Sequence, residues 1–131
     1  MKFVIFSLIF MFSVNTNINC DKFKTGKFEI ESKYGGKILI KRTHKFQTET
    51  VTRNGNVVRY KIKWSDECNF ILFDRKLLKG IEEISDINFR KELDKDTIYN
   101  EIIEINGTRS RVISKMKNFP DVIESITQKI E

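Results

Sequence analysis

The sequence predicts a mainly β protein, an antiparallel meander or open barrel of about six to eight strands with one or two short helices. Two observations support this class. Short segments alternate between apolar and polar residues, as strands with one buried face do. Glycine-containing turn signals, such as Asn54-Gly55, separate these segments. From Cys20 onward the chain has the size of a single domain, so we expect one β-rich domain over 20–131.

Five segments in the first half of the chain carry the strand pattern. Gly35-Gly36 separates the first two, Asn54-Gly55 predicts a hairpin, and a polar turn lies at 65–67. The expected strands are Lys27–Glu31, Lys37–Lys41, Phe46–Thr52, Val57–Trp64 and Cys68–Phe73.

The loop at Asn54-Gly55 decides which side chains are buried, because a slip of one residue moves every side chain of a strand to the other face. A two-residue turn would place Glu49 opposite Tyr60. A three-residue loop with Gly55 in the left-handed conformation places Thr48 opposite Tyr60 instead. We expect the three-residue loop, because it collects the apolar side chains on one face. The same alternation places Trp64 opposite Cys68.

The expected sheet therefore has one buried and one wet face. The parity of the alternation also puts His44 on the buried face, near Trp64. The predicted buried residues are Phe28, Ile30, Ile38, Ile40, Phe46, Val58, Tyr60, Ile62, Trp64, Cys68, Phe70 and Leu72. The predicted exposed residues are Glu29, Glu31, Lys37, Lys41, Lys45, Gln47, Glu49, Arg59, Lys61 and Lys63.

The second half of the chain has a different pattern. Asp74–Asp96 carries a stripe of Leu and Ile that favours a helix, although Gly80 weakens it and a long excursion between strands is the alternative. Thr97–Ile105 and Thr108–Met116 flank Asn106-Gly107 and predict a second hairpin. Pro120, Ile126 and Ile130 predict a C-terminal helix over 120–130.

The N-terminus predicts a signal peptide over 1–19. Lys2 precedes the apolar run Phe3–Phe12, which is of secretory length and shorter than the roughly 20 residues that a membrane-spanning helix needs. We expect an exported protein of the periplasm or cell surface, with no transmembrane segment in the mature chain.

Export changes how the two cysteines are interpreted. In an oxidising compartment Cys20 and Cys68 are a candidate disulfide. Its loop of about 49 residues would contribute roughly 4 kcal/mol in the chain-entropy model. Lipidation of Cys20 is an alternative, although Asn19 stands where a lipid signal needs a small residue. A pair of free buried thiols is the third reading.

The chain has a formal net charge of +6, and the positive residues are concentrated in Asp21–Lys63. A basic sheet face could bind an anionic envelope surface, whereas its alternative role is simply to keep a strand face solvated. We expect no nucleic-acid partner. The candidate basic face consists of Lys37, Lys41, Lys45, Arg59, Lys61 and Lys63.

No residue pattern predicts an enzyme. His44 is the only histidine and lacks partners at metal-ligand spacing, and there is no glycine-rich phosphate loop. Glu101 and Glu104 are expected to pair across a hairpin with Arg109 and Arg111. We expect neither a metal nor a cofactor.

The sequence therefore predicts an exported envelope protein with a binding or structural, non-enzymatic role. A lipocalin-like carrier of a small apolar ligand is one alternative, and it requires an internal cavity. In that case Tyr60, Trp64 and Phe70 are the candidate pocket lining; otherwise they are core residues. A binder of anionic surfaces is the other alternative.

Three segments carry a resemblance to known proteins: Cys20–Phe28, Arg42–Glu49 and Lys63–Leu72. They share a Cys-x-x-Phe-Lys-x-Gly-x-Phe opening and a Lys-Trp-x-x-x-Cys-x-aromatic-x-Leu strand pair. In these the chain resembles short exported, lipoprotein-like proteins of flavobacteria and relatives. The resemblance implies export, a β-meander and paired cysteines, and transfers no catalytic residue. Such chains are sometimes labelled DNA topoisomerase IV, but this one is far too short and has no recognisable ATP site.

Overall fold

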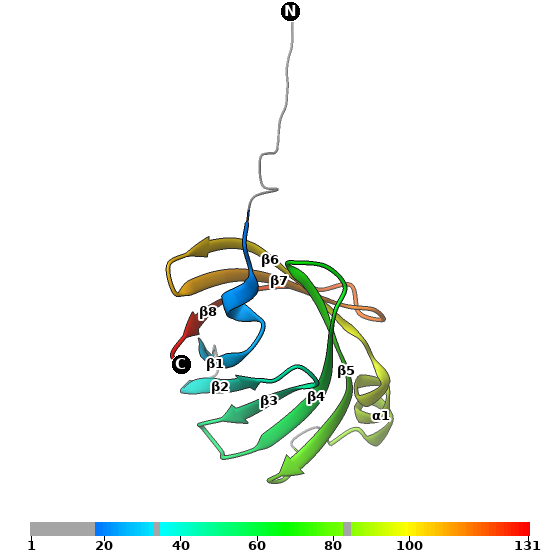
Figure 1. The fold of residues 1–131 in the computed structure, drawn as a ribbon. Coiled ribbons are helices and arrows are strands. Elements are labelled where there is room, and N and C mark those ends of the chain that lie inside the picture. The colour runs from blue at the N-terminus through cyan, green and yellow to red at the C-terminus, as the bar shows by residue number, and fades with distance from the viewer. Residues whose placement is uncertain (1–17, 33–34, 83–84) are drawn as a thin grey trace, which may run out of the picture.

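A computed structural model of the chain describes residues 18–32, 35–82 and 85–131. Eight antiparallel strands form a closed barrel in which each strand pairs with its neighbours in chain order and β8 returns to β1 (Figure 1). The mainly β class is thus confirmed. Residues 1–17 of the expected signal peptide lie outside the described part of the chain.

Within the described residues, the strands of the barrel, one 3-10 helix and one α-helix have the following bounds. The helices are η2 (Asp21–Phe23) and α1 (Ile87–Lys95). The strands are β1 (Gly26–Glu31), β2 (Lys37–Arg42), β3 (Phe46–Val51), β4 (Val57–Trp64), β5 (Asn69–Lys79), β6 (Ile98–Asn106), β7 (Arg109–Met116) and β8 (Val122–Lys129).

The register of β3 differs from the expected one. Arg42 pairs with Gln47 across a tight turn, and Gln47 pairs with Tyr60 on β4. The loop after β3 spans 52–55, one residue more than predicted, although Gly55 has the expected left-handed φ of 78°. The alternation of β3 is therefore reversed. Gln47 and Glu49 lie on the interior face, while Phe46 and the exposed His44 do not.

Hydrogen bonds at both ends of the β2–β3 hairpin hold this register. At the tight turn, the Thr43 backbone N–H donates to the carbonyl of Phe46. At the other end, Thr52 Oγ1 accepts from the Lys37 N–H and donates to the Lys37 carbonyl. These contacts cannot be inferred from the apolar pattern, which predicted the opposite face for β3.

The β4–β5 turn is also longer than expected. Trp64 pairs with Phe70, so Cys68 lies in the turn and not opposite Trp64. The Asp66 carboxylate explains the extra length, because it accepts hydrogen bonds from the backbone N–H groups of Cys68 and Asn69. Phe70 and Leu72 nevertheless keep the predicted interior orientation, since the shift is by two residues.

A β-bulge in β5 replaces the first part of the expected helix over Asp74–Asp96. Asp74 has a left-handed φ of 55°, and the register with β4 shifts around it, so Lys61 pairs with Phe73 whereas Arg59 pairs with Lys76. The extra residue reverses the alternation and turns Arg75 toward the interior. The helix itself is confined to α1, where the Asp86 side chain caps the N-terminus by accepting from the N–H groups of Asn88 and Phe89.

The predicted C-terminal helix over 120–130 is wrong, because this segment forms β8. Residues 122–128 pair with β7 in continuous register. The apolar residues Val122, Ile126 and Ile130 are four apart, and this spacing fits one face of a strand as well as one face of a helix. Pairing with β7 decided between the two.

The second hairpin forms as predicted, with β6 and β7 joined at Gly107-Thr108, one residue later than expected. Its cross-strand charge pairing is also present in part. Arg111 donates to Glu104 on β6 and to Glu124 on β8, each at 2.9 Å.

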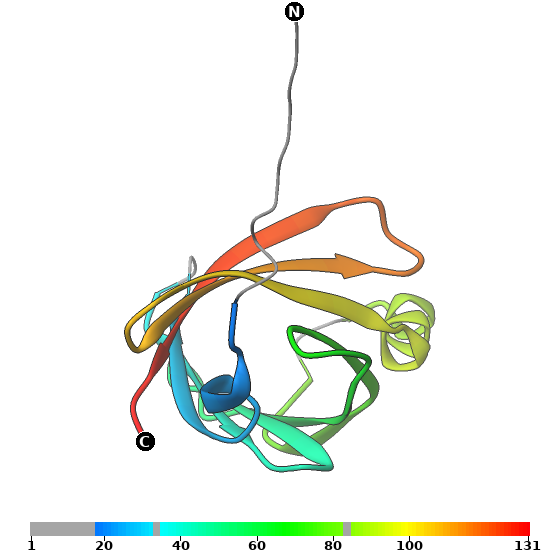
Figure 2. The ribbon, with the colours of Figure 1, turned by 45° about the horizontal axis from the view of Figure 1, so that its top comes forward.

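One end of the barrel is closed by η2, around which the strands form a ring (Figures 1 and 2). Phe23 of η2 is fully buried and its ring lies 5.9 Å from that of Phe28 on β1. The predicted disulfide is present: Cys20, just before η2, is bonded to Cys68 in the β4–β5 turn. The buried core lies at this end and comprises Cys20, Phe23, Phe28, Ile40, Ile62, Phe70, Leu72, Ile102 and Val112.

The disulfide is expected to stabilise the closed end by joining η2 to the β4–β5 turn. Replacing both cysteines by serine should lower the free energy of unfolding by about 2–4 kcal/mol, because the unfolded chain then loses a crosslink over a long loop. Urea denaturation of the two proteins, followed by circular dichroism, measures the difference. Adding a reductant should destabilise the natural protein and leave the double variant unchanged; equal stability of the two proteins would contradict the prediction.

Candidate functional site: the barrel interior

A buried arginine lies at the base of the barrel interior. The Arg42 guanidinium carbon lies 4.8 Å from the centre of the Phe28 ring and 4.7 Å from that of Phe70. Its Nη1 donates to the Phe23 carbonyl and its Nε to Gln47, both at 2.7 Å. Burial lowers the pKa of Arg42 to about 10, although the nearby Glu49 carboxylate opposes this shift. Arg42 therefore stays charged at neutral pH and fastens η2 to β1, β2, β3 and β5.

The polar interior continues from Arg42 through Gln47 to Glu49. Gln47 accepts from Arg42 and donates from Nε2 to Glu49 Oε2 at 2.8 Å. Burial raises the pKa of Glu49, and hydrogen bonding by Gln47 together with the charges of Arg42 and Arg75 only partly opposes this. A carboxylate in this position costs free energy in the folded protein, since it has lost most of its hydration.

Tyr60 and Arg75 complete the polar interior on the neighbouring strands. Arg75 donates from Nη1 to Glu82 at 2.9 Å and to Asp94 of α1 at 2.8 Å. Burial lowers the pKa of Arg75, but these hydrogen bonds outweigh it, so the net shift is upward. Burial also raises the pKa of Tyr60, which is held neutral near the Glu49 carboxylate. Arg75 thereby fixes α1 against β5.

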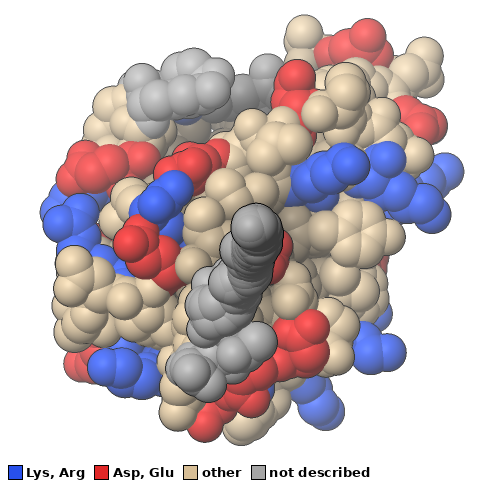
Figure 3. Space-filling view, turned by 90° about the horizontal axis from the view of Figure 1, so that it is seen from above, with Lys and Arg blue, Asp and Glu red and all other residues tan. Residues whose placement is uncertain are grey.

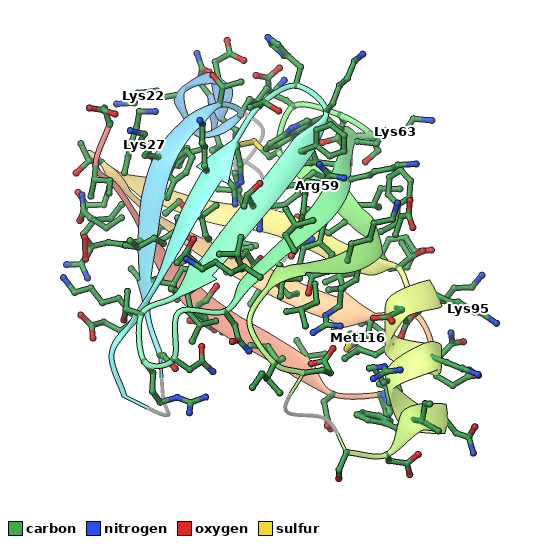
Figure 4. The ribbon with its side chains drawn as sticks, turned by 90° about the horizontal axis from the view of Figure 1, so that it is seen from below. Lys22, Lys27, Arg59, Lys63, Lys95 and Met116 are labelled. Carbon is green, nitrogen blue, oxygen red and sulfur yellow. A yellow bond between two sulfur atoms is a disulfide. The ribbon has the colours of Figure 1, made fainter. Side chains whose placement is uncertain are left out.

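The two halves of the interior are filled to different degrees. Toward η2 the inward-facing side chains are buried, whereas toward the opposite end they keep part of their surface accessible. We call this second part the open half. Its partly exposed inward-facing residues are Ile30, Ile38, Glu49, Val51, Tyr60, Arg75, Leu77 and Met116. In Figure 4, η2 lies at one end of the barrel, and α1 and Met116 lie at the other.

The barrel wall separates at two places in the open half. β5 and β6 pair only from Asn69 to Leu72 on β5, and α1 packs against β5 beyond that point. β1 and β8 pair at Phe28 and Glu29 and then diverge. A cavity of about 800 Å³ lies in this second gap, the β1–β8 cleft. It is lined both by inward-facing residues (Ile30, Ile38, Ile123, Ser125) and by outward-facing ones such as Ile126.

The three residues predicted to line a ligand pocket occupy different places. Tyr60 faces the open half. Phe70 is 2 % exposed and packs in the closed end, with its ring 4.6 Å from that of Trp64. Trp64 is partly buried, and Lys24 Nζ lies 5.3 Å from its ring centre. Of the three, Tyr60 alone lies in the open half.

The six residues of the candidate basic face lie on the outside of β2, β4 and the β2–β3 turn. Lys37 and Lys61 form ion pairs with Glu29 and Asp74, and Arg59 stacks on Phe46 with its guanidinium carbon 4.4 Å from the ring centre. Lys41, Lys45 and Lys63 are exposed. Figure 4 shows Arg59 and Lys63 on this side of the barrel. The face in Figure 3, by contrast, mixes Lys and Arg with Asp and Glu.

No metal-binding cluster of His, Cys, Asp or Glu is found among the described residues. His44 is exposed at the β2–β3 turn, and not packed near Trp64 as its parity predicted. Within the same residues, no helix combines the length and the apolar character needed to cross a bilayer.

Sequence reasoning missed the four residues that define the polar interior: Arg42, Gln47, Glu49 and Arg75. One of them carried a readable signal. Arg42 follows Ile38 and Ile40 at the period of a strand, so it shares their interior face. Gln47 and Glu49 depended on a turn length, and Arg75 depended on a bulge, neither of which the alternation specifies.

Comparisons of the chain with protein-family models, with curated proteins and with solved structures give no match.

Because burial raises the pKa of Glu49 above the usual 4.5, the folded protein binds a proton there more tightly than the unfolded chain does. The stability contributed by this group is complete below pH 4.5 and is lost as the pH rises through the higher folded pKa. Glu49→Gln should therefore raise the free energy of unfolding at pH 7, and the gain should disappear below pH 4.5.

Urea denaturation between pH 4 and pH 8 measures this effect. Glu101→Gln, an exposed substitution on β6, is the matched control and should give the natural pH profile. A gain of stability for Glu49→Gln that is the same at every pH would show that Glu49 ionisation is not its cause.

Proposed function

We propose that the protein is an exported binding protein that carries one small molecule in the open half of its barrel. The partly filled interior supports this proposal best. An eight-stranded barrel is either filled by its own side chains or holds one small ligand, and small-molecule sites commonly occupy roughly 300–1,000 Å³. The cleft of about 800 Å³ falls in this range and reaches the inward-facing residues Ile30 and Ile38.

The distribution of side chains supports a ligand that is mostly apolar with one polar group. Ile30, Ile38 and Ile123 line the cleft, and Val51 lies opposite Ile38. Glu49 lies two residues before Val51 on the same face of β3, and Tyr60 is its diagonal neighbour on β4. A few polar groups at the base of an apolar site are typical of pockets that orient a ligand. The proposed action is binding without catalysis.

Export to the periplasm or cell surface is part of the proposal. The apolar N-terminal run and the Cys20–Cys68 disulfide both favour an oxidising compartment outside the cytoplasm. The disulfide also uses the sulfur that lipidation of Cys20 would need, so we propose a protein without a lipid anchor at this residue.

A fluorescent apolar probe tests the carrier function. The natural protein should bind N-phenyl-1-naphthylamine with one site per chain. Ile38→Trp places a large side chain in the cleft and should weaken binding by about tenfold or more, equivalent to ~1.4 kcal/mol. Fluorescence titration measures both constants.

Leu39→Trp is the matched control, because Leu39 is the next residue along β2, points outward and is 39 % exposed. It introduces the same side chain and should change the affinity less than about twofold. No binding to the natural protein, or equal effects of the two tryptophans, would rule out a carrier that uses this interior.

A further inference from the structure

One carboxylate oxygen of Glu49 faces the interior without a protein partner. Oε2 accepts the hydrogen bond from Gln47, whereas Oε1 accepts none from the described residues. In that part of the chain, Asp96 Oδ2 is the single buried side-chain oxygen or nitrogen that lacks a partner. Oε1 of Glu49 is therefore not sealed off, and it contacts solvent within the barrel.

The interior guanidinium groups are already engaged. Arg75 directs Nη1 and Nη2 to the carboxylates of Glu82 and Asp94. Arg42 is 5 % exposed, lies between two phenyl rings and donates to Phe23 and Gln47. Both guanidinium groups therefore already have partners within the protein, whereas Oε1 of Glu49 accepts no hydrogen bond from the described residues.

Tyr60 provides a second acceptor beside Glu49, because its hydroxyl oxygen has two lone pairs and Arg75 engages one of them. It lies opposite Gln47 on β4, so Tyr60 and Glu49 are diagonal neighbours on the same interior face. Their proximity also contributes to the raised pKa of Tyr60. Toward the mouth, Ile38 and Val51 form an opposite pair that provides apolar surface.

We propose that Glu49 binds the head group of an amphipathic amine. The ammonium group pairs with Glu49 Oε1 and with the Tyr60 hydroxyl oxygen, and the apolar body lies along Ile38 and Val51 toward the β1–β8 cleft. This inference rests on the proposed carrier function and specifies the chemical class of its ligand.

The physical basis is the cost of the empty site. When Glu49 is ionised, its carboxylate lies in poorly hydrated surroundings, where a charge-assisted hydrogen bond to an ammonium group is strong. A carboxylate head group would instead place a second negative charge beside Glu49, and an alcohol would bring no charge to compensate it.

A series of ligands with one common tail tests the inference. Octylamine, octanol and octanoic acid are each titrated against the protein loaded with N-phenyl-1-naphthylamine, and displacement of the probe is followed by fluorescence. Octylamine should bind about tenfold or more tightly than octanol, and octanoic acid should bind most weakly. Glu49→Gln should remove the preference for the amine over octanol.

Glu101→Gln is the control for the charge change, because it removes one carboxylate from the outer surface of β6. It should keep the natural order of the three ligands. Failure of the natural protein to bind the probe or octanol would overturn the carrier function itself. Binding of both without a preference for octylamine, or a preference that survives Glu49→Gln, would overturn the amine inference alone.

The pH dependence gives an independent readout. Octylamine binding requires ionised Glu49, so its affinity should rise as the pH increases through the raised pKa of that carboxyl group. Octanol affinity should not show this rise, and neither should octylamine binding to Glu49→Gln. A flat octylamine profile from pH 4 to pH 8 would contradict the assignment. The charged or titratable groups that act on Glu49 are Arg42, Arg75 and Tyr60, and Arg75 is itself paired with Glu82 and Asp94.

Discussion

The clamp around Arg42 is the interaction on which the rest of the barrel depends. A buried guanidinium is costly unless its charge and its donors are compensated. Here the rings of Phe28 and Phe70 cover it, and the Phe23 carbonyl and Gln47 accept its hydrogen bonds. These groups come from η2 and from three strands, β1, β3 and β5, while Arg42 itself lies on β2. The Arg42 side chain therefore joins η2, the strands around it and Gln47, the next polar residue of the interior.

η2 closes one end of the barrel, and toward the other end the wall separates at two places that differ in how they are covered. Where β5 leaves β6, α1 covers the gap, and Arg75 holds it through Asp94. Where β1 leaves β8, no helix of the described chain packs into the separation, and the cleft forms. The wall of the open half is therefore covered by α1 on one side and has a cleft on the other. The bulge at Asp74 turns Arg75 inward, and Arg75 is the residue that pairs with Asp94 of α1.

The polar residues of the interior differ in how fully their hydrogen-bonding groups are satisfied. Arg42, at the base, is fully engaged by aromatic rings and hydrogen bonds, and Gln47 links it to Glu49. Glu49 is engaged through one oxygen and exposed through the other. A charge that the fold partly buries and incompletely satisfies is destabilising, and such groups concentrate at functional sites. This incomplete satisfaction is the reason to assign ligand recognition to Glu49 and a structural role to Arg42.

The sequence by itself determined the β class, most strand positions and the two glycine hairpins, because alternation and turn chemistry act over a few residues. It indicated Cys20 and Cys68 as a candidate disulfide, which the structure then showed to be formed. Tertiary structure decided what local patterns leave open. The reversed face of β3 followed from one extra loop residue, and β8 replaced an equally well-spaced helix because β7 offered it hydrogen bonds. The inward turn of Arg75 required a bulge. The residues that line the barrel interior could therefore not be predicted from the sequence, because a shift of one residue in register moves interior side chains to the outer surface.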